Sequence, residues 1–167
     1  MSGRGLRGLD MGPEAPRVVR AVVETPAGTT AAWKYDEAAG RFVYAGEYEL
    51  PVPAHYGWVC GTWNPADGDE TDVFIVDPAP RHTGEVLWAR PVALLRKADG
   101  DHKVLAIVHQ EACPVSGVKL SPVKRAIEAA FHARGAVLAG WGGRREAEAF
   151  LRETAARRSA ANLPQGR

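Results

Sequence analysis

The most restrictive feature of this sequence is a series of seven short runs rich in β-branched and aromatic residues. Glycine, proline and acidic residues separate the runs. They are VVRAVVET (18–25), AAWKY (31–35), RFVYAGEYEL (41–50), YGWVCGTW (56–63), TDVFIV (71–76), EVLWARPVALL (85–95) and KVLAIV (103–108). Short strands at such spacing are typical of antiparallel barrels and sandwiches. We therefore expect a mainly β structure between residues 17 and 108.

Two helical segments follow the predicted strands. In LSPVKRAIEAAFHAR (120–134), Val123, Ile127 and Phe131 recur every four residues and give one apolar face. Ser121 is suited to cap this helix, with Pro122 at its first position. After the segment GWGG, a second helical pattern covers residues 144–161. The order predicts an α+β fold, mainly β, in which C-terminal helices close a β domain.

The chain has 167 residues, which is about the size of one domain. We expect residues 1–16, rich in Gly, Pro and Arg, to form a flexible leader, residues 17–155 to form the single domain, and residues 156–167 to be a frayed tail. No stretch reaches the roughly 18 apolar residues of a membrane span, and the N-terminus lacks the apolar centre of a signal peptide. These features predict a soluble cytoplasmic protein with no membrane partner.

The segment Asp67-Gly68-Asp69-Glu70-Thr71-Asp72 is the most informative motif, because it places three aspartates just before the apolar run VFIV. Such clustering raises carboxyl pKa values unless cations compensate, and hard divalent ions are the usual compensation. An EF-hand is excluded, since its glycine and glutamate positions hold Asp72 and Pro78. Taken alone, the motif is equally consistent with a solvated acidic turn.

Other acidic residues occupy similar places at strand ends. Asp99-Gly100-Asp101 precedes VLAIV, and Glu24 ends the first run. Lys34 and Asp36 lie two apart on a predicted strand and so share a face. If these segments converge, seven carboxylates and two lysines line one cavity: Glu24, Asp36, Asp67, Asp69, Asp72, Asp99 and Asp101 with Lys34 and Lys103. Mg²⁺ prefers such oxygen ligands together with substrate phosphates, so this pattern favours phosphoryl chemistry.

The motifs VVETPAG, KYD, PAHYGW, DGDETDV, RPVALL and DGDHK, in this order, resemble those of the family I soluble inorganic pyrophosphatases. The resemblance covers about residues 17–108, with a weaker continuation to about 150. It implies a five-stranded OB-like closed barrel with C-terminal helices packed on it. It also implies several Mg²⁺ ions, hydrolysis of pyrophosphate to two orthophosphates, and a homohexamer.

The resemblance also implies roles for individual residues. Asp67 and Asp72 would hold the activating metals, and Asp69 would be the base that assists the attacking water. Asp101 and Asp99 would bind the metal that arrives with the substrate. The remaining matches are Glu24 and Asp36 as further metal ligands, and Lys34, Tyr56 and Lys103 as phosphate contacts.

The sequence departs from the family pattern on the phosphate side. Tyr44 stands where the family usually has an arginine, and Val52 where it has a tyrosine. The usual Tyr-Lys pair near the C-terminus appears as Ala133-Arg134, so Tyr44 and Arg134 are the candidate substrate contacts there. These changes leave two alternatives beside pyrophosphate hydrolysis: a homologue redirected to an organic diphosphate or another phosphorylated metabolite, and a non-catalytic metal-binding member.

The charge distribution supports a cation site and gives no support to a nucleic-acid partner. Residues 21–118 carry 7 basic and 14 acidic side chains, and half of those acids belong to the proposed site. The ten basic residues after position 118 alternate with Ala and Glu at helical spacing, which is typical of an amphipathic surface helix.

Overall fold

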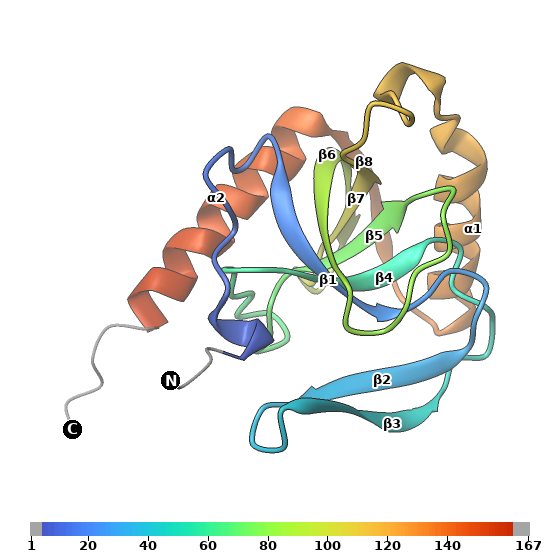
Figure 1. The fold of residues 1–167 in the computed structure, drawn as a ribbon. Helices are drawn as coiled ribbons and strands as arrows, with labels where there is room; N and C mark the ends of the chain where they lie inside the picture. Colours follow the sequence, from blue (N-terminus) through green and yellow to red (C-terminus); the bar gives the residue numbers. More distant parts are fainter. Residues whose placement is uncertain (1–4, 162–167) are drawn as a thin grey trace.

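The computed structural model describes residues 5–161, and its centre is a closed barrel of five strands (Figure 1). The barrel order is β1-β4-β5-β7-β6, and β6 pairs back onto β1 to complete the closure. Strands β5 and β7 are parallel, whereas the other barrel pairs are antiparallel. The barrel strands are β1 (Val19–Thr25), β4 (His55–Val59), β5 (Asp72–Val76), β6 (Val86–Lys97) and β7 (Lys103–Val108). The expected five-stranded barrel, in an α+β and mainly β fold, is confirmed.

The other elements surround the barrel. They are the short turns η1 (Leu6–Gly8) and η2 (Val115–Gly117), the hairpin β2 (Ala31–Asp36) and β3 (Arg41–Glu47), the helix α1 (Leu120–Ala133), the strand β8 (Leu138–Gly143) and the helix α2 (Arg144–Ala161). The hairpin forms a separate two-stranded sheet that projects below the barrel in Figure 1. No helix within residues 5–161 has the length and apolar character needed to cross a membrane.

The helices explain why several barrel strands are apolar on both faces. Every residue of β7 is buried, because one face lines the barrel and the other is covered. Ile127 and Phe131 of α1 pack in a cluster with Phe74, while Ala147 and Leu151 of α2 pack in the main core. The four-residue apolar spacing of α1 is therefore confirmed. The helix nevertheless begins at Leu120 with Lys119 as N-cap, so the prediction of Ser121 as the cap is wrong.

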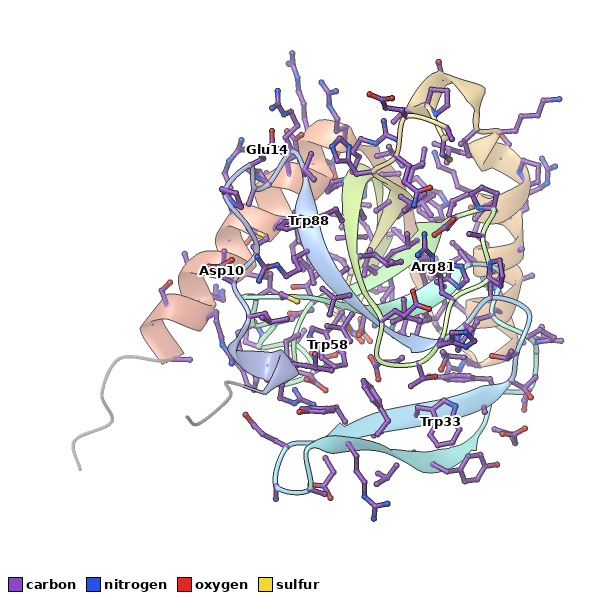
Figure 2. The ribbon with its side chains drawn as sticks, viewed as in Figure 1. Asp10, Glu14, Trp33, Trp58, Arg81 and Trp88 are labelled. Carbon is purple, nitrogen blue, oxygen red and sulfur yellow. The ribbon has the colours of Figure 1, made fainter. Side chains whose placement is uncertain are left out.

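Trp58 of β4 connects the barrel to the projecting hairpin. Its ring centroid lies 6.2 Å from that of Tyr35 and 6.0 Å from that of Phe42, one residue from each strand of the hairpin. Figure 2 shows Trp58 between the barrel and the hairpin, close to the N-terminal turn. This aromatic contact fixes the hairpin against the end of the barrel where the acidic residues lie.

Residues 5–16, which we expected to form a flexible leader, pack against the barrel. Leu6 and Leu9 pack against Val22, Trp58 and Cys60, and Met11 and Ala15 pack against the main core. The leader has no hydrophobic period because these side chains reach the barrel from an irregular segment and not from one face of a helix or strand. Residues 1–4 lie outside the described part.

The C-terminal prediction also changes. Helix α2 continues to Ala161, so residues 156–161 of the expected frayed tail are helical, and residues 162–167 lie outside the described part. The Arg158 side chain donates a hydrogen bond of 3.0 Å to the carbonyl of Arg7, which joins α2 to the N-terminal segment. The segment GWGG (140–143) is part of β8, where Trp141 pairs with Leu95 of β6.

Candidate active site

Three carboxylates meet at one end of the barrel. Asp67, Asp72 and Asp101 each offer an oxygen within 4.8 Å of those of the other two. The parallel register of β5 and β7 brings them together: Val73 pairs with Val104, so the residues just before them, Asp72 and Lys103, lie side by side. Asp67 comes from the turn before β5, and Asp101 from the turn before β7. The predicted convergence of the two acidic turns is therefore observed.

Lys103 is buried among these acids, with 4% of its surface exposed. Its Nζ donates hydrogen bonds to Asp72 and, over 2.9 Å, to Asp101. Burial alone would lower the pKa of Lys103, but Asp72 and Asp101 raise it. Lys97, which the sequence did not single out, lies 3.6 Å from Asp101. One fixed ammonium and a second nearby balance part of the negative charge.

The raised pKa values of Asp67 and Asp72 indicate that the cluster needs further positive charge. Burial, followed by the charges of Asp72 and Asp101, raises the pKa of Asp67 to about 6. Burial also raises the pKa of Asp72, against the opposing effects of Lys103 and a hydrogen bond with Tyr56. Carboxylates with raised pKa values in a cluster lack compensating positive charge. A hard divalent cation, which prefers oxygen ligands, can supply this charge.

Glu24 and Lys34 form a second part of the site. Glu24 is the penultimate residue of β1 and is 7% exposed, and burial raises its pKa to about 8. The Lys34 Nζ, on β2 of the hairpin, lies 4.0 Å from a Glu24 oxygen. The charges of Asp72 and Asp69 contribute to the pKa values of both residues, so this pair adjoins the three-acid cluster.

Asp69 turns toward the N-terminal segment. Its Oδ1 accepts hydrogen bonds of 3.0 Å from Arg7 and 2.9 Å from the backbone N–H of Glu70. Burial opposes ionisation of Asp69, but hydrogen bonds with Glu70 and Arg7 outweigh it and lower its pKa to about 2. Asp69 is therefore held as a carboxylate beside the cluster.

Three of the predicted site residues lie away from the cluster. Asp36 accepts a hydrogen bond from the Ala39 N–H in the hairpin turn, and Asp99 accepts one from the Asp101 N–H and lies 3.5 Å from Lys97. Both carboxylates fold back onto their own turns. Tyr44 pairs with Trp33 across the hairpin, so it lies on the face opposite to the neighbouring Lys34. Tyr44 is thus not directed to the same side as Lys34, and its role as a substrate contact stays a prediction.

Tyr48 lies at the site and was missed in the sequence. Its ring is 6.4 Å from that of Tyr56, and the Arg134 guanidinium stacks over it at 5.0 Å. Burial raises the pKa of Tyr48, and the charges of Lys34 and Glu24 also act on it. Tyr48 lies just beyond β3, and only the chain reversal after it places it beside Tyr56. The sequence carries no signal for that reversal other than Pro51 and Pro53.

An apolar cleft opens beside Tyr56 and Arg134. Its volume is about 40 Å³, roughly three times the 10–15 Å³ that one water needs. The walls come from the segment after β3, from β4 and β5, and from the end of α1. Its main apolar lining residues are Leu50, Val52, Pro53, Phe74, Ala130 and Phe131.

Comparison with known proteins agrees with this arrangement. The family model described as "Inorganic pyrophosphatase" matches residues 21–158. The inorganic pyrophosphatase of Gluconobacter oxydans is 31% identical over 111 residues, and that of Aeropyrum pernix is 33% identical over 117 residues. Each match covers 64% of this chain and 64% of the relative, so it spans somewhat less than two thirds of these curated proteins.

Solved structures match over more of the chain. Inorganic pyrophosphatase from Thermus thermophilus superposes with a TM-score of 0.78 and 27% identity, and the match covers 93% of this chain and 99% of that one. The enzyme from Ehrlichia chaffeensis gives a TM-score of 0.75 at 22% identity, covering 87% and 98%, which supports the fold. Since the family model covers most of the sequence, this chain belongs to the inorganic pyrophosphatase family.

Proposed function

We propose that this protein hydrolyses inorganic pyrophosphate to two orthophosphates with the help of several bound Mg²⁺ ions. The observation that carries the proposal is the cluster of Asp67, Asp72 and Asp101, whose oxygens lie within 4.8 Å of one another beside the buried Lys103. The family is metal-dependent, and small oxygen-rich clusters of this kind suit Mg²⁺, which bridges to substrate phosphates.

The residues divide into three roles in this proposal. Asp67, Asp72 and Asp101 would hold the metal, with Glu24 beside them. Bound Mg²⁺ would supply a water of lowered pKa and would neutralise phosphate charge. The chain's own cations, Lys34 and Lys103, and the hydroxyl of Tyr56 bind phosphate oxygens and keep the pyrophosphate in place. Arg134 extends this positive side at the mouth of the cleft.

Asp69 assists the chemical step. Water attacks one phosphorus atom, the bridging P–O bond breaks, and one orthophosphate leaves as the other takes up the water oxygen. The Asp69 carboxylate, which Arg7 and the Glu70 N–H hold beside the cluster, orients this water and accepts its proton. Glu24 and Lys103 are buried at the site, which shields their charges from bulk water.

The decisive experiment measures phosphate release from pyrophosphate with and without Mg²⁺. We expect turnover by the wild type, and a loss of about a hundredfold or more in Asp72→Asn, because one metal ligand is removed and Lys103 is left with one partner. Glu37→Gln, an exposed acid at the hairpin turn, is the matched control. A folded wild type that binds Mn²⁺ by calorimetry yet releases no phosphate would refute hydrolysis and support the non-catalytic alternative.

The apolar cleft favours an organic diphosphate as a second candidate substrate. In that case the diphosphate would sit at Lys34, Lys103 and Arg134, and a short alkyl group would enter between Leu50 and Val52. Water would attack the terminal phosphorus, and an alkyl monophosphate would leave. The cleft volume suits a short branched chain better than a nucleoside.

Comparing pyrophosphate, isopentenyl diphosphate and ADP under identical Mg²⁺ conditions tests this candidate. If the alkyl diphosphate is the substrate, Leu50→Asp should reduce its kcat/KM about tenfold or more while pyrophosphate hydrolysis is retained, because an apolar contact worth roughly 1.5–3 kcal/mol is lost. Clear preference for pyrophosphate with no effect of Leu50→Asp eliminates the second candidate.

A further inference from the structure

The N-terminal strap, which we define as residues 5–9, is held in place at three points. Leu6 and Leu9 pack into the cluster of Val22, Trp58 and Cys60. Gly5 lies against Tyr35, since a Cβ at this glycine would be 3.0 Å from the tyrosine hydroxyl oxygen. Arg158 of α2 binds the carbonyl of Arg7 over 3.0 Å. The strap is therefore packed between the barrel, the hairpin and α2 (Figure 1).

Arg7 is the charged residue of the strap, and its side chain binds the loop between Asp67 and Asp72. Its Nη1 donates to Asp69 Oδ1 over 3.0 Å and also to Glu70 Oε2, and its guanidinium lies 5.5 Å from the centroid of the Trp58 ring. The Arg7 side chain is 22% exposed, and that of Glu70 is 3% exposed. The Asp69 side chain is 42% exposed, so the buried Glu70 and the Trp58 ring are the contacts that hold the arginine in one geometry.

The two acids that Arg7 contacts depend on it to different degrees. Glu70 has a second arginine, Arg158, whose Nη1 lies 3.7 Å from Glu70 Oε1. For Asp69, Arg7 is the one side-chain cation that binds it among residues 5–161. Asp69 Oδ1 is fixed by Arg7 and by the Glu70 N–H. This oxygen is thus anchored by the strap and by the loop itself.

We infer that Arg7 is a positioning residue, which holds the Asp69 carboxylate in the orientation that the hydrolytic step needs. The inference rests on the proposed function and adds to it a residue outside the motifs of the sequence. Positioning of this kind acts on the chemical step more than on substrate affinity, because Arg7 binds Asp69 and not the phosphates. The strap then belongs to the site as the support of its base.

The test compares Arg7→Gln, Arg7→Lys and the control Arg17→Gln by steady-state hydrolysis of Mg²⁺-pyrophosphate. Arg17 is an exposed arginine of the same N-terminal region that pairs with Glu14. We expect Arg7→Gln to lower kcat about tenfold or more with KM changed less than twofold, and Arg7→Lys to recover part of the loss. Mn²⁺ affinity, measured by calorimetry, should stay within twofold of the wild type, and Arg17→Gln should match the wild type throughout.

A double-mutant comparison separates positioning from general support of the fold. In an Asp69→Asn background, adding Arg7→Gln should leave kcat unchanged, because Arg7 acts through Asp69. Further loss of kcat in that background would overturn the inference, as would a kcat for Arg7→Gln equal to or above that of the wild type. Wild-type protein without turnover overturns the proposed function and the inference together. Wild-type turnover with an unaffected Arg7→Gln overturns the inference alone.

Discussion

Glu24 shows how burial sets the behaviour of a single carboxyl group. It is the penultimate residue of β1, with 7% of its surface exposed, and Lys34 lies 4.0 Å away, yet burial dominates and raises its pKa from 4.5 to about 8. Between these two pH values the folded protein keeps a proton that the unfolded chain has released. Stability of the metal-free protein therefore decreases as pH rises from about 4.5 to about 8, and it is unaffected by this group outside that window.

Glu24→Gln should remove this pH dependence in metal-free protein. Glutamine stays neutral across this pH range, whereas the wild-type glutamate must ionise. The free energy of unfolding of the variant should therefore exceed that of the wild type by an amount that grows with pH across the window. The difference should reach a few kcal/mol (about 1.4 kcal/mol per pKa unit). Urea unfolding in EDTA at several pH values measures this difference. A constant difference between wild type and variant from pH 4.5 to 8 would contradict the assignment.

Asp36 separates what the family resemblance implies from what the structure shows. The resemblance makes it a metal ligand, but its Oδ1 accepts the Ala39 N–H over 2.9 Å in the hairpin turn. We expect Asp36→Asn to change the Mg²⁺ concentration for half-maximal activity less than threefold and to reduce stability by at most about 1 kcal/mol, since an amide oxygen can still accept this bond. A tenfold or larger shift in Mg²⁺ dependence would restore Asp36 to the metal site.

At the scale of elements, the contact between β1 and β4 depends on one glycine. A Cβ at Gly57 would lie 1.7 Å from the Val22 carbonyl oxygen, so the two backbones approach more closely than any side chain permits. The register of this pair shifts just beyond, between Val23 and Thr25. This close approach positions Tyr56 on β4 beside Glu24 at the end of β1.

Gly57→Ala should therefore destabilise the protein by about 3 kcal/mol or more, because a backbone carbonyl must move to admit the methyl group. Gly143→Ala is the matched control: Gly143 is exposed, and its added Cβ would meet no atom within 4 Å. Denaturant midpoints of both variants check the prediction. Comparable stability of the two variants would show that the barrel tolerates a wider spacing here.

Local patterns predicted the elements that have strong local signals. Each of the seven apolar runs contains a strand, and the four-residue spacing of Val123, Ile127 and Phe131 identified α1. Strand β8 was not predicted, because Gly140, Gly142 and Gly143 give this segment a low strand propensity. It forms since pairing with β6 satisfies its backbone hydrogen bonds.

At the scale of the molecule, both ends of the described chain meet at the loop that carries the aspartates. Arg7 from the N-terminal strap and Arg158 from α2 lie on either side of the buried Glu70. The loop is thus fixed by segments about 150 residues apart in sequence, as the Arg158 to Arg7 contact also shows. No sequence pattern within either segment predicts this contact.

The resemblance to family I enzymes leads us to propose a homohexamer. Val86 and Trp88 project from β6 with 42% and 40% of their surfaces exposed, and burial of such side chains at an interface is favourable. Light scattering coupled to gel filtration should give a mass six times the 17.9 kDa of one chain. A mass equal to one chain at micromolar concentration would refute the hexamer.

The sequence alone determined a strand-rich domain and a set of candidate acids, because both leave local marks: apolar runs between turns, and aspartates at the strand ends. The local runs are also typical of a sandwich, and the five-stranded barrel was implied by the family resemblance. Only the tertiary structure decided which candidates reach the centre. Asp36 and Asp99 accept hydrogen bonds within their own turns, and Tyr44 lies on the hairpin face opposite to Lys34. Tyr48 and Arg7 lie at the site although they belong to segments without a motif. The physical reason is that packing between segments far apart in the sequence sets where a side chain points. Here the contacts of Trp58 and of the N-terminal strap supply that packing.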